Sequence, residues 1–190
     1  MSKAVLISIR PKWCEKIVNG EKTIEVRKTK PKLETPFKCY IYCTLPKYPH
    51  EDFIATDYPM PQFYGGGKVI GEFTCDRICK IDKDSTDFLF KFGRLSVYKQ
   101  AAEEKCGLCM AMTDDELHGY LGHCQGYGWH ISDLRIYDPP KELSEFKTLC
   151  RVDADCCACP YCNYTKMGCD GRVIGRPPQS WCYVDDLQTK

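Results

Sequence analysis

Short strand-like runs joined by short helices constrain the fold of this chain more than any other feature. The runs occupy residues 4–9, 23–27, 37–44, 68–75 and 129–137. They are apolar or alternate between apolar and polar residues, as is typical of buried or half-buried strands. A doubly wound sheet needs a substantial helix between successive strands. The pattern therefore predicts a mainly β (α+β) fold, built as a small β-barrel with short helices.

Two helical regions are predicted between these runs. The first covers residues 11–19, with Trp13 and Ile17 at helical spacing and Gly20 placed for a left-handed C-terminal cap. The second is an insertion at about residues 86–124, in which a capping-box pattern precedes an apolar run. That pattern is Thr113-Asp114-Asp115-Glu116. The late strand should then end at Asp138-Pro139-Pro140, because proline donates no ladder hydrogen bond.

Length and charge limit the number of domains and the kind of partner. A chain of 190 residues suits one domain with a small appendage. We expect a barrel at residues 1–148 and, at residues 149–190, a cysteine-rich segment followed by a tail that packs back on the barrel. Residues 1–47 carry eleven Lys or Arg against four Asp or Glu, which suits an anionic partner such as a nucleic acid. A solvated lysine surface is the alternative interpretation.

The apolar runs also bear on location. Residues 4–9 form the longest apolar run near the N-terminus, and they are too few for a membrane span or a secretory signal. We therefore expect a cytoplasmic protein that makes no membrane contact. Fifteen cysteines fit a secreted disulfide scaffold only where an export signal is present. Their thiols are then expected to be buried, free or bound to metal.

The pattern Gly20-x-Lys22-x-x-Glu25-x-Arg27 lies at the turn from the first helix into the second strand. Both the motif and its setting resemble the signature of the ASCH family. The resemblance extends over most of the first 146 residues. It implies a PUA-like β-barrel with a conspicuous cleft, in a family long proposed to bind RNA.

The chemistry of the motif also suits a nucleotide. Alternation sends Ile24 and Val26 to the core face of their strand. Glu25 and Arg27 then share the other face, with Lys22 beside them. Arginine grips phosphate through two hydrogen bonds, lysine adds a point charge, and glutamate accepts from an amino group on a base edge. An ordinary surface ion pair of Glu25 and Arg27 is the alternative interpretation.

Basic and aromatic side chains complete the predicted nucleic-acid-binding set. Its members are Lys22, Arg27, Lys28, Lys30, Trp129, His130, Arg176 and Trp181. Lys32 continues the positive surface along a path for a nucleic-acid backbone. Trp181 follows two prolines in the tail, where it either stacks on a base or anchors the tail as a buried hydrophobic residue.

Two enzymatic alternatives follow from the resemblance. Some ASCH relatives are amidohydrolases of N4-acetylcytidine, which implies a catalytic set of Lys, Thr and Glu. Lys22 matches the lysine, but Glu25 stands where the threonine is expected. The tentative catalytic pair is therefore Lys22 and Glu25, acting as acid and base. Other relatives are reported as ribonucleases, for which Glu72 and His130 are the candidates. A hydrogen-bonded structural role is the alternative for His130.

A cysteine-rich stretch after residue 149 predicts a structural zinc knuckle. Its overlapping Cys-x-x-Cys pairs suit tetrahedral zinc, because a two-residue spacer lets both thiolates reach one ion. The predicted ligands are Cys156, Cys159, Cys162 and Cys169. Cys150 and Cys157 are the alternative ligands, and a loop of free thiols is the competing interpretation. A zinc-stabilised module that binds a partner protein is the third functional hypothesis, beside nucleotide binding and hydrolysis.

Overall fold

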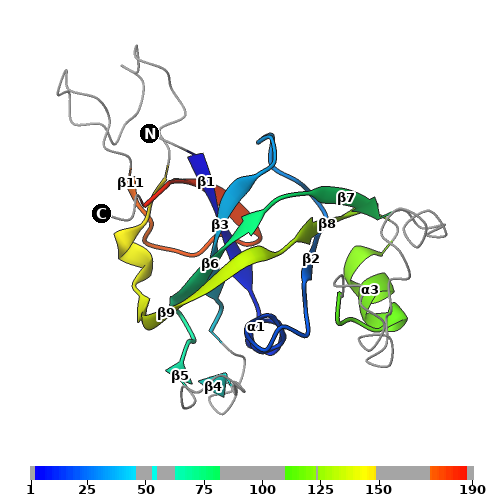
Figure 1. The fold of residues 1–190 in the computed structure, drawn as a ribbon, viewed down its shortest axis with the longest axis horizontal. Coiled ribbons are helices and arrows are strands. Elements are labelled where there is room, and N and C mark those ends of the chain that lie inside the picture. Colours follow the sequence, from blue (N-terminus) through cyan, green and yellow to red (C-terminus); the bar gives the residue numbers. More distant parts are fainter. Residues whose placement is uncertain are drawn as a thin grey trace.

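The computed structural model describes residues 3–45, 53–54, 63–81, 110–122, 124–148 and 172–187. In these residues the chain is mainly β, with two packed sheets and two α-helices at their margins (Figure 1). The predicted fold class is therefore confirmed. No helix in the described part of the chain is long and apolar enough to cross a membrane.

The larger sheet has seven strands. In spatial order they are β11 (Arg172–Val173), β10 (Lys147–Thr148), β12 (Trp181–Asp185), β1 (Lys3–Ile9), β3 (Phe37–Cys43), β6 (Val69–Cys75) and β9 (Ser132–Lys141). β1 and β3 are parallel and the other neighbours are antiparallel, so the sheet is mixed. Because β12 pairs with β1, the C-terminal tail lies against the N-terminal strand.

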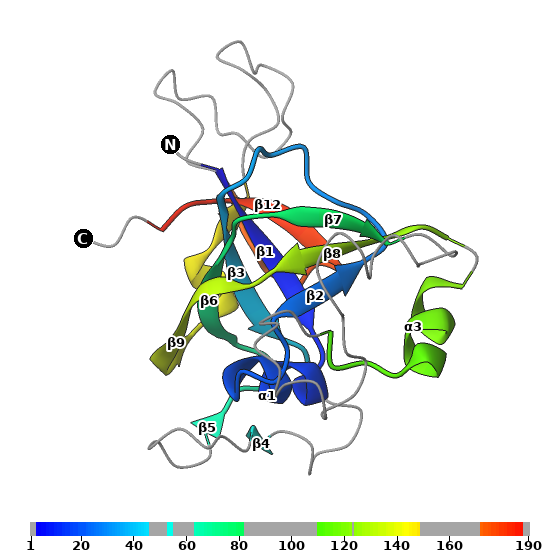
Figure 2. The same cartoon turned by 45° about the vertical axis from the view of Figure 1, so that its right-hand side comes forward.

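The smaller sheet has three strands and lies across the larger one (Figure 2). Its order is β2 (Ile24–Arg27), β8 (Gly126–His130) and β7 (Ile78–Ile81). The main hydrophobic cluster joins residues of both sheets, including Val5, Ile41, Phe73 and Trp129. A separate antiparallel pair is formed by β4 (Phe53–Ile54) and β5 (Phe63–Tyr64).

The helices begin and end as their local sequence predicts. α1 (Pro11–Val18) starts on its proline, and Gly20 just beyond it has φ +73°, the left-handed conformation that glycine adopts without strain. α3 (Asp114–Leu121) begins with the predicted capping box, in which Thr113 and Glu116 cap each other's backbone. A short 3-10 helix, η3 (Leu143–Glu145), follows β9. Residues 86–109 and residue 123 of the predicted helical insertion lie outside the described residues.

The single late strand predicted at residues 129–137 is wrong. The chain forms β8 in the smaller sheet, breaks at Ile131, and continues as β9 in the larger sheet. β9 also runs through Pro139 and Pro140 to Lys141 instead of ending before them. It is the edge strand beyond β6, where a missing N–H removes no hydrogen bond that a neighbouring strand requires.

Both faces of β2 are buried, although alternation assigned only one face to the core. Ile24 and Val26 pack with residues such as Met110 and Leu121 in a second hydrophobic cluster. The opposite face of β2 turns toward the larger sheet, because Arg27 reaches the main-chain oxygen of Ser8 on β1. The motif side chains therefore lie inside the molecule and not on its surface.

Candidate functional site

Lys22, Glu25 and Arg27 form a buried charge cluster. They are 2%, 3% and 7% exposed, and no other Lys, Arg, Asp or Glu in the described part of the chain is classed as buried. The local sequence explains their positions. Gly20 ends α1, and the N–H of Lys22 donates to the Lys16 carbonyl oxygen at 2.9 Å, which fixes the turn into β2. Glu25 and Arg27 follow two residues apart on one strand face.

Glu25 lies between the two cations. Its Oε2 is 3.5 Å from Lys22 Nζ, and its Oε1 accepts a hydrogen bond from Arg27 Nη1. Arg27 also donates from Nη2 to the Ser8 carbonyl oxygen at 2.6 Å, and Lys22 Nζ donates to the Met110 carbonyl oxygen at 2.6 Å. Three segments far apart in sequence thus hold the cluster, which carries one net positive charge.

Three polar atoms near this cluster are buried without a hydrogen-bond partner. Among the described residues they are Glu25 Oε2, Arg27 Nε and Trp129 Nε1. Trp129 pairs with Glu25 across β8 and β2, so their side chains share a face of the sheet, as do those of Glu25 and Arg27. These atoms therefore belong to one sheet face, which offers two donors and one acceptor, Glu25 Oε2, that is ion-paired with Lys22 but accepts no hydrogen bond.

Burying charged groups costs free energy, so stabilisation of the fold does not account for the charge cluster. Removing charges from water carries a penalty of several kcal/mol per ion, and apolar residues of similar volume often serve stability as well or better. Leaving polar atoms unpaired adds to that cost, at about 1–3 kcal/mol for each group. The charge cluster is therefore retained at a cost to the stability of the fold, as the charged groups of binding and catalytic sites often are.

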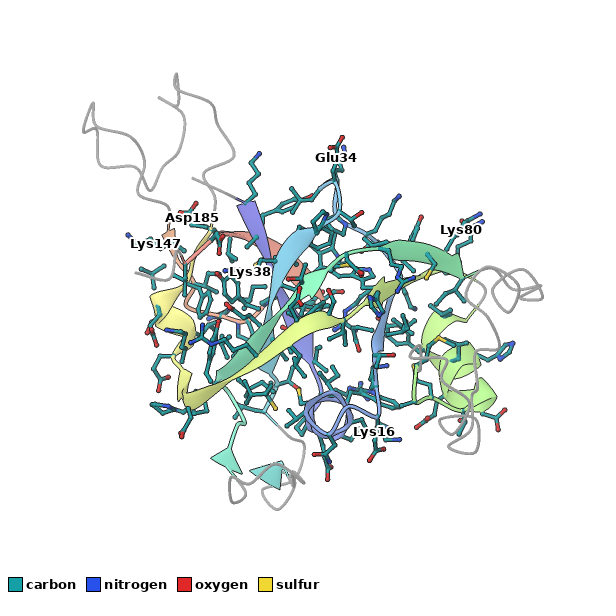
Figure 3. All side chains as sticks on the ribbon, in the orientation of Figure 1. Lys16, Glu34, Lys38, Lys80, Lys147 and Asp185 are labelled. Carbon is teal, nitrogen blue, oxygen red and sulfur yellow. The ribbon has the colours of Figure 1, made fainter. Side chains whose placement is uncertain are left out.

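Lysines and a tryptophan of α1 form one wall of the cluster. The ring of Trp13 lies 5.1 Å from Lys22 Nζ, 4.3 Å from Lys12 Nζ and 5.6 Å from Lys16 Nζ. Lys16, which projects from α1 (Figure 3), donates to the Ala111 carbonyl oxygen at 3.3 Å. The positive field around Lys22 is thus reinforced by Lys16, whereas the charge of Lys12 is offset by Glu116, whose Oε1 lies 2.7 Å from Lys12 Nζ.

The Met110 carbonyl and Trp13 are parts of the site that sequence reasoning missed. Met110 is 88 residues from Lys22 along the chain, so no local pattern could indicate their contact. Trp13 was assigned only to the apolar face of α1. The signal available in the sequence was that Trp13 lies nine residues before Lys22 and between Lys12 and Lys16, which suits contacts between a ring and cations.

The other predicted binding residues lie at the edges of this region or away from it. His130 Nδ1 is 2.5 Å from Asp76 Oδ1, and its register partner is Ile24, on the face of β2 opposite Glu25. Trp181 is partly exposed, and its ring centroid lies 5.9 Å from that of Trp129. Arg176 is exposed.

The basic residues after the motif form an exposed stretch. Lys28, Lys30 and Lys32 are all exposed in the loop that joins β2 to β3.

Glu72, the other ribonuclease candidate, faces away from the cluster. It pairs with Tyr40 across β6 and β3, and Tyr40 belongs to the hydrophobic cluster on the far face of the larger sheet. There the Tyr137 hydroxyl donates to Glu72 Oε2 at 2.6 Å, beside a cavity of about 700 Å³. The structure therefore does not bring Glu72 together with Lys22, Glu25 or His130.

The predicted zinc ligands Cys156, Cys159, Cys162 and Cys169 lie outside the described residues. Among the described residues, no group of three or more His, Cys, Asp or Glu could hold a metal ion. Several cysteines in the described part of the chain are buried in the core. Burial raises the pKa of Cys75 to about 12 and that of Cys79 to about 11. Such thiols are protonated at neutral pH.

The described chain on either side of the cysteine-rich segment is paired. Lys147 on β10 is the register partner of Val173 on β11, and Thr148 is that of Arg172.

The fold is that of the ASCH domain proteins, which confirms the fold that the motif resemblance implies. The crystal structure of ASCH from Zymomonas mobilis aligns with a TM-score of 0.51 at 17% identity, over 96% of this chain and 87% of that chain. Its tyrosine-to-phenylalanine variant gives a TM-score of 0.52 at 16% identity, over 97% of this chain and 91% of that chain. No family model and no curated protein matches the chain.

Proposed function

We propose that the chain is an ASCH-domain protein that binds RNA or a modified nucleotide at the charge cluster. The observation that carries the proposal is that Glu25 Oε2, Arg27 Nε and Trp129 Nε1 are buried without a hydrogen-bond partner, although Glu25 Oε2 keeps its ion pair with Lys22. Buried polar atoms in folded proteins are nearly always hydrogen-bonded. Unpaired atoms on one sheet face, beside a net positive charge, support a ligand as the missing partner.

The chemistry of these atoms matches the polar edge of a base. Glu25 Oε2 accepts a hydrogen bond from an exocyclic amino group, while Arg27 Nε and Trp129 Nε1 donate to a ring nitrogen or a carbonyl oxygen. The positive charge left over in the cluster attracts the phosphate. Lys22 Nζ, which now donates to the Met110 carbonyl oxygen, exchanges that partner for an oxygen of the ligand.

The test is nucleotide and RNA binding by a Lys22→Met variant. This change removes the excess positive charge but keeps the length of the side chain and leaves Glu25 paired with Arg27. Fluorescence anisotropy with labelled short RNA at low salt should show affinity at least about tenfold below that of wild type, as loss of a charged hydrogen bond implies. The matched control is Lys3→Met, which neutralises an exposed lysine on β1. Equal affinity for both variants would reject the proposal.

Hydrolysis is the second candidate function, and the contact between Lys22 and Glu25 supports it. Their 3.5 Å separation in a buried setting suits an acid and base pair. N4-acetylcytidine and a labelled oligonucleotide should each be incubated with wild type and with Glu25→Asp, and the products separated by chromatography. Turnover by wild type that Glu25→Asp slows is the expected result for an enzyme. If both substrates stay intact with both proteins, the site binds its ligand without hydrolysing it.

We also infer a structural zinc ion held by Cys156, Cys159, Cys162 and Cys169. The pairing of β10 with β11 supports this, because it anchors both ends of the segment that carries these cysteines. Four thiolates leave no position for a catalytic water, so the ion contributes stability. Metal analysis of the purified chain should find about one zinc per chain, and Cys159→Ser should reduce it. Metal-free wild type that unfolds at the same temperature as the untreated protein would contradict the inference.

A further inference from the structure

The loop that follows β2 carries three exposed lysines. Among the described residues, no carboxylate lies within ion-pair distance of Lys28, Lys30 or Lys32. Figure 2 shows this loop passing from β2 over the end of the molecule where β7 and β12 lie. Its positive charge is therefore available to an anionic partner.

Aromatic side chains from three different elements meet this loop. The Lys28 ammonium lies 5.6 Å from the ring centroid of Tyr120 on α3, and that of Lys30 lies 5.7 Å from Tyr127 on β8. Two hydrogen bonds join β12 to the loop. Trp181 Nε1 donates to Thr29 Oγ1 at 3.0 Å, and the Tyr183 hydroxyl accepts from the Lys32 N–H at 2.8 Å. Trp181 and Tyr183 also pack edge to face at 5.4 Å.

Interleaved lysines and aromatic rings suit an unpaired nucleic-acid strand. Each nucleotide presents a phosphate for a lysine and a flat base for a ring, whereas in a duplex the base faces are stacked on each other. Tyr120 is exposed, whereas Tyr127 is half-buried against the main hydrophobic cluster. Contacts between lysine and tyrosine near the surface are weak, so Lys28 and Lys30 can leave their rings for phosphates while bases take their place on the accessible ring faces. Tyr120 is 37% exposed and accessible to such stacking.

The loop surface, defined as Lys28, Lys30 and Lys32 with Tyr120, Tyr127, Trp181 and Tyr183, is continuous with the charge cluster. Tyr127 is the register partner of Arg27 across β8 and β2, and the ring of Trp181 lies 5.9 Å from that of Trp129. A strand with one nucleotide at the cluster therefore has its neighbouring nucleotides beside this surface.

We propose that the loop surface binds the nucleotides that flank the one held at the charge cluster, so that the ligand is a single strand and not a free nucleotide. This inference rests on the proposed function of the cluster. It adds a substrate class and two stacking residues, Tyr120 and Tyr127, to that function.

The experiment measures affinity against ligand length by fluorescence anisotropy, with labelled single-stranded RNA from a mononucleotide to an octamer. Wild type should bind the octamer at least about tenfold more tightly than the mononucleotide, since each stacked base adds affinity. Lys28→Ala combined with Lys30→Ala should remove most of that gain and lower the salt slope by about two. Tyr127→Leu should weaken the octamer about tenfold without changing the salt slope. Mononucleotide binding should stay as in wild type for all these variants.

The matched control is Lys147→Ala, because Figure 3 places Lys147 at the opposite end of the molecule from α3. Equal affinity for the mononucleotide and the octamer, or loop variants that bind the octamer like wild type, would overturn the inference and leave the cluster proposal standing. Competition by polyglutamate as effective as that by RNA would overturn it in favour of an acidic protein partner. Loss of mononucleotide binding only in Lys22→Met supports the cluster separately.

Discussion

The buried polar groups on the two faces of the larger sheet differ in how completely they are hydrogen-bonded. On one side the charge cluster leaves Glu25 Oε2, Arg27 Nε and Trp129 Nε1 without hydrogen bonds. On the other side Tyr137 donates to Glu72 at 2.6 Å and Tyr40 donates to Asp186 at 2.6 Å. Lys38 Nζ lies 3.2 Å from Asp186 Oδ1 and 3.9 Å from Glu72 Oε2, and we call these five residues the tyrosine network. Within the described chain none of its side-chain atoms is buried without a partner.

This difference is why we propose the site from incomplete hydrogen bonding and not from open volume. The tyrosine network adjoins the cavity of about 700 Å³, yet its polar groups satisfy one another. The charge cluster is closed around Met110 and Trp13, but its hydrogen bonds are incomplete. Because an unpaired buried atom costs free energy, it marks a place where a ligand has most to contribute.

Neutralising the acid on each side should give the largest contrast in stability. Glu25→Gln leaves Lys22 and Arg27 as buried cations without a counter-charge, and should lower the free energy of unfolding by about 3–5 kcal/mol. Glu72→Gln keeps an acceptor for the Tyr137 hydroxyl, and should cost about 1 kcal/mol. Urea denaturation at neutral pH measures both values. Equal losses would break the contrast between the two faces.

A second contrast concerns ligand binding. Trp129→Phe removes an indole N–H that has no partner in the free protein, and should weaken RNA binding about fivefold to tenfold through loss of one hydrogen bond. Tyr137→Phe removes a hydroxyl that is already paired with Glu72, and RNA binding should not change. Anisotropy titrations compare the two. Weaker RNA binding by Tyr137→Phe would contradict the proposal, because it would place the ligand on the face that carries the tyrosine network.

The smallest effect is expected at alkaline pH. Burial, and then the hydrogen bond to Glu72, raises the pKa of Tyr137 above its ordinary value of 10.0. A raised folded pKa means that its contribution to stability is complete below about pH 10 and is lost as the pH rises above that value. As the pH rises from neutral to above about 10, the free energy of unfolding should therefore fall less for Tyr137→Phe than for wild type. Thermal unfolding across that range tests this, and parallel curves would contradict it.

Much of the N-terminal half could be predicted because its signals are local. Pro11 and Gly20 set the ends of α1, and residues two apart on a strand share a face wherever the strand lies. The same local logic identified the capping box of Thr113 and Glu116.

The tertiary surroundings of those elements could not be predicted. Alternation separates Ile24 from Glu25, but only the fold covers both faces of β2. The break at Ile131 depends on a switch between sheets, and the contact from Lys22 to Met110 spans 88 residues. Such features arise from packing between distant segments, which no short window of sequence encodes.

The most direct test of the central claim is the indole N–H signal of Trp129 in a nitrogen-15 NMR spectrum recorded as RNA is added. The chain has three tryptophans, so Trp→Phe variants assign the three signals. If the cluster binds a nucleotide, the Trp129 signal shifts in a saturable way as its unpaired N–H gains an acceptor. A Trp129 signal that stays in place at saturating RNA would contradict the account.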